Sequence, residues 1–554
     1  MQIIIPMSGF GERFKKAGYK IPKPLIEVEG KPIISHVIDM FPGEENFLFI
    51  CNEDHLNNPD YKMREILDMY CPTGKILSIP SHKLGPVHAV LKAKNLIDLE
   101  KEVVINYCDF TCYWDWNHFK NFVLKNKCDG CIPSYKGFHP HSLGNTNYAY
   151  LKEDLGVVSD IQEKKPYTSN RMEEYASSGT YYFSSGKIMC NALEYVLSEK
   201  LKTGSEYYVS LAYHYLFDKN MLVNVYPLQH FMQWGTPEDV NEYTSWSDIF
   251  KELQTERDLV KDSRSEGSVI IPMAGLGQRF LDEGYSKTKP LIPVSGDPMV
   301  IKAVNDLPNA QNYCFVLRSD TTDYDSIVTR IKKEFPNAIV KTVSETTEGQ
   351  ASTAMLGFEE IKNSLGSVPG PITVGACDNG AIYNEEIFSK LANNQEIDII
   401  VWGYRGNTNA IRKPEMFGWI DEDKNIINNI SVKTPLNNPD NDPIVTGTFT
   451  FRNMDIFSSC MYSLFNRNGK INGEFYLDSC INDAIKIGFK CVLFEIEHYI
   501  SWGTPNDLRT YEYWQSCFHK WPGHPYRLEK DKNIHKNAVK ILDKNYKIFN
   551  MHVK

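Results

Sequence analysis

The chain has 554 residues, 42% of them hydrophobic and 23% charged, with a formal net charge of −10 at pH 7. This composition is typical of a globular protein with a substantial core, and the negative charge argues against a nucleic-acid-binding protein, which usually carries a basic field. No run of about 18 apolar residues occurs, so we expect no membrane-spanning helix.

The amino terminus and the cysteines indicate a cytoplasmic protein. Gln2 leads directly into an apolar segment, without a secretory signal. The 13 cysteines are scattered through the chain, which favours reduced thiols over a disulfide framework. Cys128 and Cys131 form a lone CxxC pair that lacks the second ligand pair zinc would require, so we expect buried thiols there.

The predicted elements of the first part alternate between strand and helix. Apolar runs at 2–7 and 102–108 are typical of buried parallel strands. Between them, 31–41 and 85–97 carry apolar residues three and four positions apart, which favours helices. The alternation predicts an α/β fold with a doubly wound, mostly parallel sheet and helices on both faces. Ligands of such sheets bind beyond the carboxyl ends of the strands, where the first glycine loop and Asp109 fall.

The second half of the chain repeats the first. IIPMSGFGERFKKAGYKIPKPLIEVEGKPII at 4–34 is matched by IIPMAGLGQRFLDEGYSKTKPLIPVSGDPMV at 270–300, 266 positions later. Five further pairs follow in the same order: LGPVHAVLKA and EGQASTAMLG, VVINYCDF and PITVGACDN, ASSGTYYF and IVTGTFTF, GSEYYVS and NGEFYLD, and QWGTPEDVNEY and SWGTPNDLRTY. The offset drifts by only a few residues, so insertions fall in loops, and the repeat sets the architecture.

We therefore predict two tandem units of one Rossmann-like fold, at 1–255 and 269–515. The charged segment 256–268 lacks aromatic residues and is interpreted as the end of an exposed helix and a linker. The Lys- and His-rich segment 516–554 has no counterpart in the first unit. It is interpreted as a solvated helix or a docking arm on the second unit.

The repeated loop carries residues that suit a bound polyphosphate. Gly9 and Gly11 permit close backbone approach, so that successive N–H groups can surround phosphate oxygens. Arg13 adds a planar, permanent charge, and Pro24 stiffens the backbone after Lys23, which holds a second cation in place. The combination predicts a site for a nucleoside triphosphate (NTP).

Other interpretations of this loop fit less well. A dinucleotide-binding fingerprint needs a third glycine, but Phe14 and Phe280 stand there, and the Gly-Lys-Ser/Thr of a P-loop is absent. The plain alternative is a tight turn with solvated charges. Against it, both copies keep the spacing from Arg to Lys, while neighbours such as Lys15 and Leu281 differ.

The motifs together resemble a known family. GxGxRF followed by KPL, a GxxxA helix, a strand-end Asp and a late Glu-Lys pair are similar to those of the sugar-phosphate nucleotidyltransferases, also called nucleotide-sugar pyrophosphorylases. The wording GYKIPKPLIEV resembles a branch that includes cytidylyltransferases of bacterial surface-polysaccharide pathways. The resemblance covers both units and implies a tandem duplication of the nucleotidyltransferase domain.

The resemblance implies an enzyme of the EC 2.7.7 type, in which an acceptor phosphate attacks the α-phosphorus of an NTP and pyrophosphate leaves. The product would be an activated precursor for capsule or other surface polysaccharide. CTP is the favoured nucleotide, with UTP and dTTP as alternatives, and the acceptor is a sugar or polyol phosphate. Mg²⁺ is the implied cofactor. We expect no nucleic-acid or membrane partner, and either a monomer with two catalytic units or a homo-oligomer.

The family motifs, matched position by position, imply roles for particular residues. Catalytic roles fall to Arg13, Lys23, Arg279 and Lys289. Nucleotide binding falls to Met7, Gly9, Gly11, Gly85, Met273, Gly275, Gly277 and Gly349. Acceptor binding falls to Glu163, Lys164, Gly179, Lys433 and Gly447, and metal binding to Asp109 and Asp378.

The second unit departs from the family at its acceptor motif. Lys433 survives, but Val432 stands where the first unit has Glu163. A buried apolar side chain cannot pair with an acceptor hydroxyl. We therefore predict two non-identical activities, or one active unit beside a modified one.

Both units depart from the family at a second metal position. The family commonly places an Asp there, whereas this chain has Gln233 and Ser501. The nearby acids Asp239 and Asp507 are candidates for the same role, with helix capping as the alternative.

Two further function classes stay open. A glycosyltransferase of related fold (GT-A-like) would want an Asp-x-Asp at the metal strand, which CDFT and CDNG lack, although WDW at Asp115 keeps the idea alive. A regulatory pseudoenzyme, in one half or both, would bind nucleotide without turnover. The intact Arg, Lys and Asp of both units argue against complete loss of chemistry.

Overall fold

The structure, a computed structural model, describes residues 1–144, 147–255 and 267–546. The chain divides into two compact units. The first contains Met1–Gln254 together with Tyr513–Asp531 and the described residues from Lys540 onward, and the second contains Thr255–Glu512 and Lys532–Val539. The expected linker lies outside the described residues except for Gly267 and Ser268.

The first unit is built on one ten-stranded sheet. Its strands are β1 (Gln2–Met7), β4 (Phe47–Asn52), β5 (Lys75–Ile79), β6 (Val103–Asn106), β8 (Gly130–Tyr135), β9 (Ala149–Asp154), β10 (Val157–Glu163), β11 (Tyr175–Ser177), β12 (Thr180–Phe183) and β13 (Val223–Leu228). Their order is β11-β9-β10-β13-β8-β12-β6-β1-β4-β5. Strands β5, β4, β1 and β6 run parallel, whereas β12 is antiparallel to both its neighbours. The sheet is thus parallel on the side of the glycine loop and mixed beyond it.

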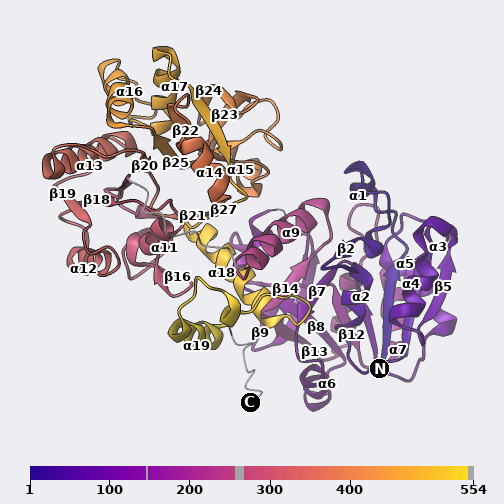
Figure 1. Cartoon of the computed structure of the whole chain (residues 1–554). Helices are drawn as coiled ribbons and strands as arrows, with labels where there is room; N and C mark the ends of the chain where they lie inside the picture. Colours follow the sequence, from indigo (N-terminus) through magenta and orange to yellow (C-terminus); the bar gives the residue numbers. More distant parts are fainter. Residues whose placement is uncertain (145–146, 256–266, 547–554) are drawn as a thin grey trace. The chain divides into compact units, whose positions relative to one another are not determined.

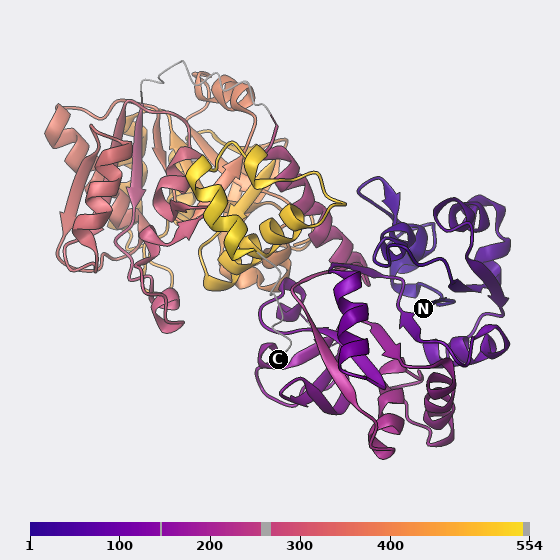
Figure 2. The ribbon, with the colours of Figure 1, turned by 90° about the horizontal axis from the view of Figure 1, so that it is seen from below.

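Helices cover this sheet (Figures 1 and 2). They are α1 (Glu12–Lys16), α2 (Ile33–Ile38), α3 (Glu53–Asn57), α4 (Met63–Tyr70), α5 (Pro86–Lys92), α6 (Trp116–Lys125), α7 (Gly186–Ser198), α8 (Tyr213–Asp218) and α9 (Pro237–Glu252). Val87 of α5 and Leu193 of α7 share a core cluster with Ile4 of β1. Because side chains alternate along a strand, Ile3 and Ile5 are buried on the opposite face.

The second unit repeats nine of the ten strands of this sheet in the same order. Its strands are β15 (Ser268–Pro272), β18 (Asn312–Arg318), β19 (Ile339–Val343), β20 (Ile372–Val374), β22 (Ile399–Tyr404), β23 (Gly418–Asp423), β24 (Ile426–Val432), β25 (Ile444–Phe451) and β26 (Cys491–Glu495). The order β19-β18-β15-β20-β25-β22-β26-β24-β23 corresponds to β5-β4-β1-β6-β12-β8-β13-β10-β9. The tandem duplication predicted from the sequence is therefore also a duplication of topology.

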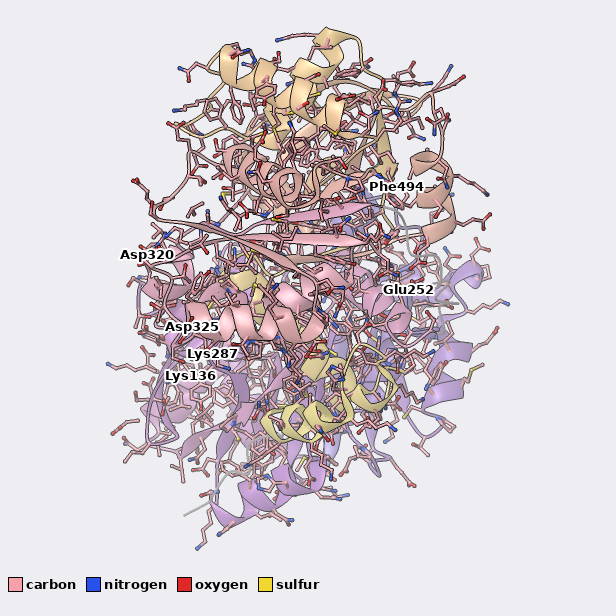
Figure 3. All side chains as sticks on the ribbon, turned by 60° about the vertical axis from the view of Figure 1, so that its left-hand side comes forward. Lys136, Glu252, Lys287, Asp320, Asp325 and Phe494 are labelled. Carbon is pink, nitrogen blue, oxygen red and sulfur yellow. The ribbon has the colours of Figure 1, made fainter. Side chains whose placement is uncertain are left out.

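The helices of the second unit pack on its sheet in the same way. They are α10 (Gln278–Asp282), α11 (Met299–Asn305), α12 (Tyr324–Glu334), α13 (Gln350–Leu365), α14 (Glu385–Ala392), α15 (Thr408–Arg412), α16 (Met454–Asn466) and α17 (Leu477–Ile487). Phe358 of α13 and Phe457 of α16 stack in the core, with ring centroids 4.8 Å apart. Among the side chains labelled in Figure 3, Asp320 and Asp325 are exposed, whereas Phe494 is buried.

A two-stranded ribbon in each unit brings the late Gly-Thr motif beside the strand-end Asp. In the first unit β7 (Phe110–Tyr113) pairs with β14 (His230–Gln233), and Trp234 N donates to Asp109 O at 2.8 Å. In the second unit β21 (Asn379–Ile382) pairs with β27 (His498–Ser501), and Trp502 N donates to Asp378 O, also at 2.8 Å. Short hairpins follow the KPL segments, formed by β2 (Glu27–Val28) with β3 (Lys31–Pro32) and by β16 (Pro293–Val294) with β17 (Asp297–Pro298).

The C-terminal segment differs from its sequence interpretation. Helix α18 (Pro505–Lys520) passes from the second unit into the first, and α19 (Lys536–Asn545) follows it. Residues 513–531 belong to the first unit rather than to the second, and Phe518, Trp521 and Tyr526 are buried there. Aromatic side chains decide this placement, because they gain more from burial than the neighbouring lysines gain from solvent.

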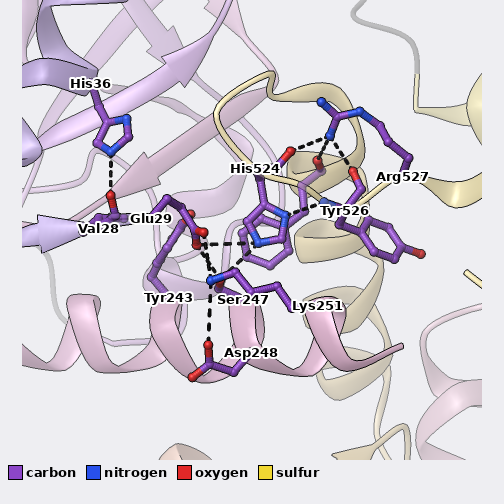
Figure 4. Close-up of polar contacts among 11 residues, drawn as sticks. Val28, Glu29, His36, Tyr243, Ser247, Asp248, Lys251, His524, Tyr526 and Arg527 are labelled. Carbon is purple, nitrogen blue, oxygen red and sulfur yellow. Dashed lines mark hydrogen bonds and ion pairs between the residues drawn. The ribbon is translucent and has the colours of Figure 1, made fainter. Parts of the chain in front are cut away.

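Polar contacts fix this segment to α9 and to the β2–β3 turn (Figure 4). His524 Nε2 lies 3.1 Å from Ser247 Oγ and 3.6 Å from Glu29 Oε1, and Lys251 Nζ lies 2.8 Å from Glu29 Oε2. Burial lowers the pKa of His524 to about 3, so this imidazole is neutral at physiological pH. Arg527 N donates to the side chain of Gln254 at 2.9 Å.

All 13 cysteines, Cys128 and Cys131 among them, are free thiols. Within the described ranges, we find no helix with the length and apolar character needed to cross a bilayer.

Candidate functional site

A cavity of about 700 Å³ opens at the carboxyl ends of β1 and β6 in the first unit. Its lining includes every residue that the motifs single out in this unit: Met7, Gly9, Gly11, Arg13, Lys23, Gly85, Asp109, Glu163, Lys164 and Gly179. These positions span much of the unit's sequence. The fold therefore brings all of the first unit's candidates to one place.

The glycine loop enters the cavity between β1 and α1. Gly11 has φ of 66°, a left-handed conformation that glycine adopts without strain. A Cβ at Gly9 would meet nothing within 4 Å, so the backbone there borders open space. Arg13 follows on α1 and is exposed. Its charge acts on Lys23, which places both cations at the same wall.

Lys23 and Asp109 form an ion pair in the floor of the cavity. Lys23 Nζ donates to Asp109 Oδ2 at 2.7 Å, and each side chain is 25% exposed. Burial alone would lower the pKa of Lys23, but the carboxylate of Asp109 and the thiol of Cys108 outweigh it and raise that pKa above its usual value. Lys23 is therefore a permanent cation, held within reach of a ligand by a carboxylate.

Gly85 provides a flat wall at the start of α5. Its φ is 88°, and a Cβ there would lie 2.7 Å from the carbonyl oxygen of Tyr207. No other residue fits without moving the chain, so the position is fixed by close backbone packing. The imidazoles of His82 and His88 lie nearby, with ring centroids 4.8 Å apart.

The residues present fit a magnesium ion only if the substrate supplies most of its ligands. Asp109 offers one carboxylate, whereas Gln233 is engaged by Tyr148 and donates to Asp239 at 2.7 Å. No group of three His, Cys, Asp or Glu side chains suited to a metal occurs in the described residues. Mg²⁺ commonly takes one or two carboxylates and completes its octahedron with water and phosphate oxygens, and Asp109 is suited to that arrangement.

Asp239 and Asp507 each cap a helix. Asp239 Oδ2 accepts from Thr236 N at 2.9 Å while Asp239 N donates to Thr236 Oγ1, which is a capping box at the start of α9. Asp507 and Thr504 repeat this arrangement at the start of α18. Both side chains therefore take the capping role that the sequence offered as one of two alternatives.

The far wall of the cavity holds Glu163 and Lys164. Ser210 Oγ donates to Glu163 Oε2 at 2.5 Å, and Lys164 Nζ donates to the Tyr208 hydroxyl at 2.6 Å. Burial raises the pKa of Glu163 to about 7, against the opposing effects of Ser210 and Lys164. Tyr208 in turn donates to Glu206. An ammonium and a carboxyl with a raised pKa thus line the same cavity as Lys23.

The motifs did not single out Tyr208 or Ser210 as site residues, although both contact predicted side chains. The repeat offered a signal. At the offset of 268 that relates GSEYYVS to NGEFYLD, Tyr208 corresponds to Tyr476 while Ser210 corresponds to Asp478. The tyrosine is kept in both units, whereas the serine two positions later is replaced by an aspartate in the second unit. This replacement indicates a place where the two units differ.

The second unit reproduces the nucleotide side of this arrangement. Gly277 has φ of 65°, and Lys289 Nζ donates to Asp378 Oδ2 at 2.5 Å. Burial lowers the pKa of Lys289, but the carboxylate of Asp378 opposes this effect, and the pKa is raised above its usual value. The charge of Arg279 lowers this pKa. The remaining predicted nucleotide-binding residues are the buried Met273, the open Gly275 and Gly349, where a Cβ would lie 2.7 Å from the carbonyl oxygen of Phe475.

The second unit differs from the first around the predicted acceptor-binding residues Lys433 and Gly447. Lys433 follows β24, as Lys164 follows β10, and its ammonium lies 5.7 Å from the centroid of the Tyr476 ring. Gly447 has φ of 83°, close to the 100° of Gly179. Phe417 takes the place of Tyr148, so the hydroxyl that contacts Gln233 in the first unit has no equivalent there.

Residues 2–249 match the family model described as nucleotidyl transferase. This match covers nearly all of residues 1–254 of the first unit. The resemblance inferred from the motifs is confirmed at the level of the family, whereas the cytidylyltransferase branch stays a prediction.

Curated relatives match part of the chain. It is similar to the bifunctional protein GlmU of Methanocaldococcus jannaschii, with 24% identity over 285 residues that make up 51% of this chain and 61% of that protein. A stretch of 98 residues is 35% identical to GlmU of Methanococcus maripaludis and covers 22% of it. The chain therefore spans less than two thirds of the length of these relatives.

Among solved structures, a nucleoside-diphosphate-sugar pyrophosphorylase from Vibrio cholerae RC9 is similar at 20% identity, with a TM-score of 0.37 over 44% of this chain and 98% of that one. The inositol-1-phosphate CTP transferase from T. maritima is similar at 15% identity, with a TM-score of 0.35 over 45% of this chain and 95% of that one.

Proposed function

We propose that each unit transfers a nucleotidyl group from an NTP to a small phosphorylated acceptor, with release of pyrophosphate. One observation carries the proposal. Residues assigned separately to triphosphate, metal and acceptor line a single cavity in the first unit, with the Lys23–Asp109 pair in its floor. The match of residues 2–249 to the nucleotidyl transferase family supports it.

In this reaction the protein positions the reactants and stabilises the charge of the transition state, and it forms no covalent intermediate. An oxygen of the acceptor phosphate forms a bond to the α-phosphorus, the bond from that phosphorus to the bridging oxygen of the β-phosphate breaks, and the electron pair leaves with pyrophosphate. Lys23 would offset the charge that grows on the α-phosphate oxygens. Arg13, at the glycine loop, would hold the leaving pyrophosphate.

The metal and the acceptor have separate walls. Asp109 would hold Mg²⁺, which neutralises phosphate charge and orients the triphosphate when bound. Lys164 would bind the acceptor phosphate, and Glu163 would accept a hydrogen bond from an acceptor hydroxyl. A sugar or polyol phosphate meets both requirements, since it carries a dianion and several hydroxyls on one small molecule.

The base would lie against Gly85, whose backbone leaves no room for a side chain. We propose CTP as the first nucleotide to test, followed by UTP and dTTP, and the product as a precursor for a surface polysaccharide. Asp378, Lys289 and Lys433 would serve the second unit on its own acceptor, because Val432 replaces the carboxylate of Glu163.

The decisive experiment incubates the full chain and Mg²⁺ with each NTP and a panel of sugar and polyol phosphates. Pyrophosphate release is measured, and products are identified by mass spectrometry. We expect nucleoside-diphosphate sugars or polyols. Transfer of the sugar from a supplied nucleotide-sugar to an acceptor hydroxyl, with release of the nucleoside diphosphate, would favour a glycosyltransferase. Nucleotide binding without release of pyrophosphate would favour a regulatory pseudoenzyme.

A further inference from the structure

The second unit has not lost the acceptor-side carboxylate; it has a carboxylate on a different element. In the first unit, β9 pairs with β10 so that Ala149 lies opposite Glu163, and Ser210 donates to Glu163 from the neighbouring element. In the second unit, β23 pairs with β24 so that Gly418 lies opposite Val432. At the position of Ser210 stands Asp478, at the start of α17.

Three positions therefore change together. Glu becomes Val on β24, Ser becomes Asp on the facing element, and Ala becomes Gly on β23. The third change makes room for the second, because a Cβ on Gly418 would overlap Oδ2 of Asp478. The carboxylate of Asp478 fills the space that the methyl group of Ala149 would occupy.

The electrostatic setting of the carboxylate is also preserved. Burial raises the pKa of Asp478 to about 6, and Lys433 opposes that rise. Glu163 stands in the same relation to Lys164, which opposes the effect of burial on it. Arg279 and Glu474 act on Lys433 in addition to Asp478, so the ammonium stands among the groups of the site. Each unit thus keeps one buried carboxyl with a raised pKa beside its acceptor lysine.

We infer that Asp478 is the acceptor-binding carboxylate of the second unit, and that it selects a different acceptor from the one bound by Glu163. The inference rests on the proposed function of the site. Asp478 approaches from the side of α17, whereas the place of Glu163 on β24 is taken by apolar Val432. The second acceptor is a phosphate ester with a hydroxyl on the side that faces α17. On the side that faces β24 it carries no hydroxyl, because the apolar wall there cannot satisfy one.

The first test is the variant Asp478→Asn in the full chain, assayed with CTP, UTP and dTTP. The acceptor probes are glucose 1-phosphate, its 2-, 3-, 4- and 6-deoxy analogues, ribitol 5-phosphate and glycerol 3-phosphate. For the product whose formation Lys289→Ala abolishes, we expect kcat/KM for the acceptor to fall about 10- to 100-fold, the effect of a lost hydrogen bond to a charged group. KM for the NTP and the product abolished by Lys23→Ala stay unchanged.

The second test transplants the arrangement. Gly418→Ala, Val432→Glu and Asp478→Ser together rebuild the first unit's wall in the second, and we expect the second unit to gain the acceptor preference of the first. Lys486→Ala, an exposed change on α17, is the matched control. Thermal melting shows that each variant is folded, and a variant that fails to fold is replaced by Asp478→Glu, which keeps the charge and is expected to alter acceptor preference.

The outcomes separate the two claims. An Asp478→Asn chain that keeps full kcat/KM for the Lys289-dependent product overturns the inference and leaves the proposed function standing. A transplant that keeps the original preference does the same. If Lys23→Ala and Lys289→Ala both leave every product unchanged, or the native chain consumes none of these probes, the proposed function itself falls and this inference with it.

Discussion

Lys23 donates to Asp109 at 2.7 Å in the first unit, and Lys289 donates to Asp378 at 2.5 Å in the second. The glycine loops agree as closely, with φ of 66° at Gly11 and 65° at Gly277. The two units differ around Lys164 and Lys433, the predicted acceptor lysines. Glu163 of the first unit is replaced by Val432 in the second, and Ser210 is replaced by Asp478.

This contrast shows which part of the site tolerates divergence. Under the proposed function, the retained cations and left-handed glycine would meet a triphosphate of fixed geometry. The altered wall would meet an acceptor that can vary, and there the carboxylate has changed element while the lysine has stayed. Duplication followed by change on one wall would then give two specificities from one fold, because function resides in the site rather than in the fold.

The largest expected effect comes from the lysines that define the retained side. Lys23→Ala is expected to lower the rate of one product about 100- to 1000-fold, as for other lost transition-state charges, and Lys289→Ala to do the same for the other product. Single-turnover rates measured product by product test this. Lys16→Ala, exposed on α1, is the control for the first unit. Equal loss of one common product in both variants would refute the divergence.

Stability offers the next contrast, because the C-terminal segment packs on the first unit. Trp521 is 6% exposed, and its ring lies 5.2 Å from His36. Trp521→Ala is expected to destabilise the first unit by about 3–5 kcal/mol, with faster hydrogen exchange in peptides of β1 and β6. Peptides of β15 and β20 keep their protection, and so does every peptide in Ile541→Ala, which changes an exposed residue of α19. Equal loosening of both units would contradict the assignment.

Glycine substitutions probe the wall expected to carry the base. Gly85→Ala and Gly349→Ala each force a Cβ to 2.7 Å from a carbonyl oxygen, and we expect about 1–3 kcal/mol of lost stability with a raised KM for NTP in the affected unit only. Gly156→Ala is the matched control, since its φ of 84° imposes the same strain in open space. An unchanged KM for NTP in both Gly85→Ala and Gly349→Ala would contradict the proposal that the base lies against these glycines.

The smallest effect is a difference in pH dependence. The folded pKa of Glu163 is about 7, above the 4.5 of the free side chain, so below pH 7 the carboxyl is protonated and accepts a hydrogen bond from a hydroxyl more weakly than the carboxylate does. Acceptor kcat/KM in the first unit is expected to rise with pH up to about 7 and then level off, and in the second unit to level off near the pKa of Asp478, about 6. In the Glu163→Gln variant, we expect the rise in acceptor kcat/KM of the first unit with pH to disappear. If this rise persists in the variant, it belongs to the titration of another group.

Much of the fold and half of the site follow from the sequence, because repeated motifs mark the ends of adjacent strands. Lys23 and Asp109 are 86 positions apart, yet each follows an element that leads to the same edge of the sheet. Ser210 and Glu163 meet only through the pairing of β9 with β10 and the course of the chain into α8, which a pattern in one sequence does not specify. The C-terminal segment could not be placed, since its aromatic residues lack a counterpart in the repeat.

The order in which the chain is made gives that segment a further meaning. Phe250 of α9 packs against Phe518 and Tyr526, which emerge only after the whole second sheet has been translated. From Gln254 to Asp531 there are 277 residues, 531 minus 254, and synthesis at about 5–20 residues per second takes roughly 14–55 s. During that interval the first half of the chain is already synthesised, but Phe250 lacks its packing partners Phe518 and Tyr526. A message cut short inside the later half would leave the first unit without residues 513–531 and the second unit without part of its own chain.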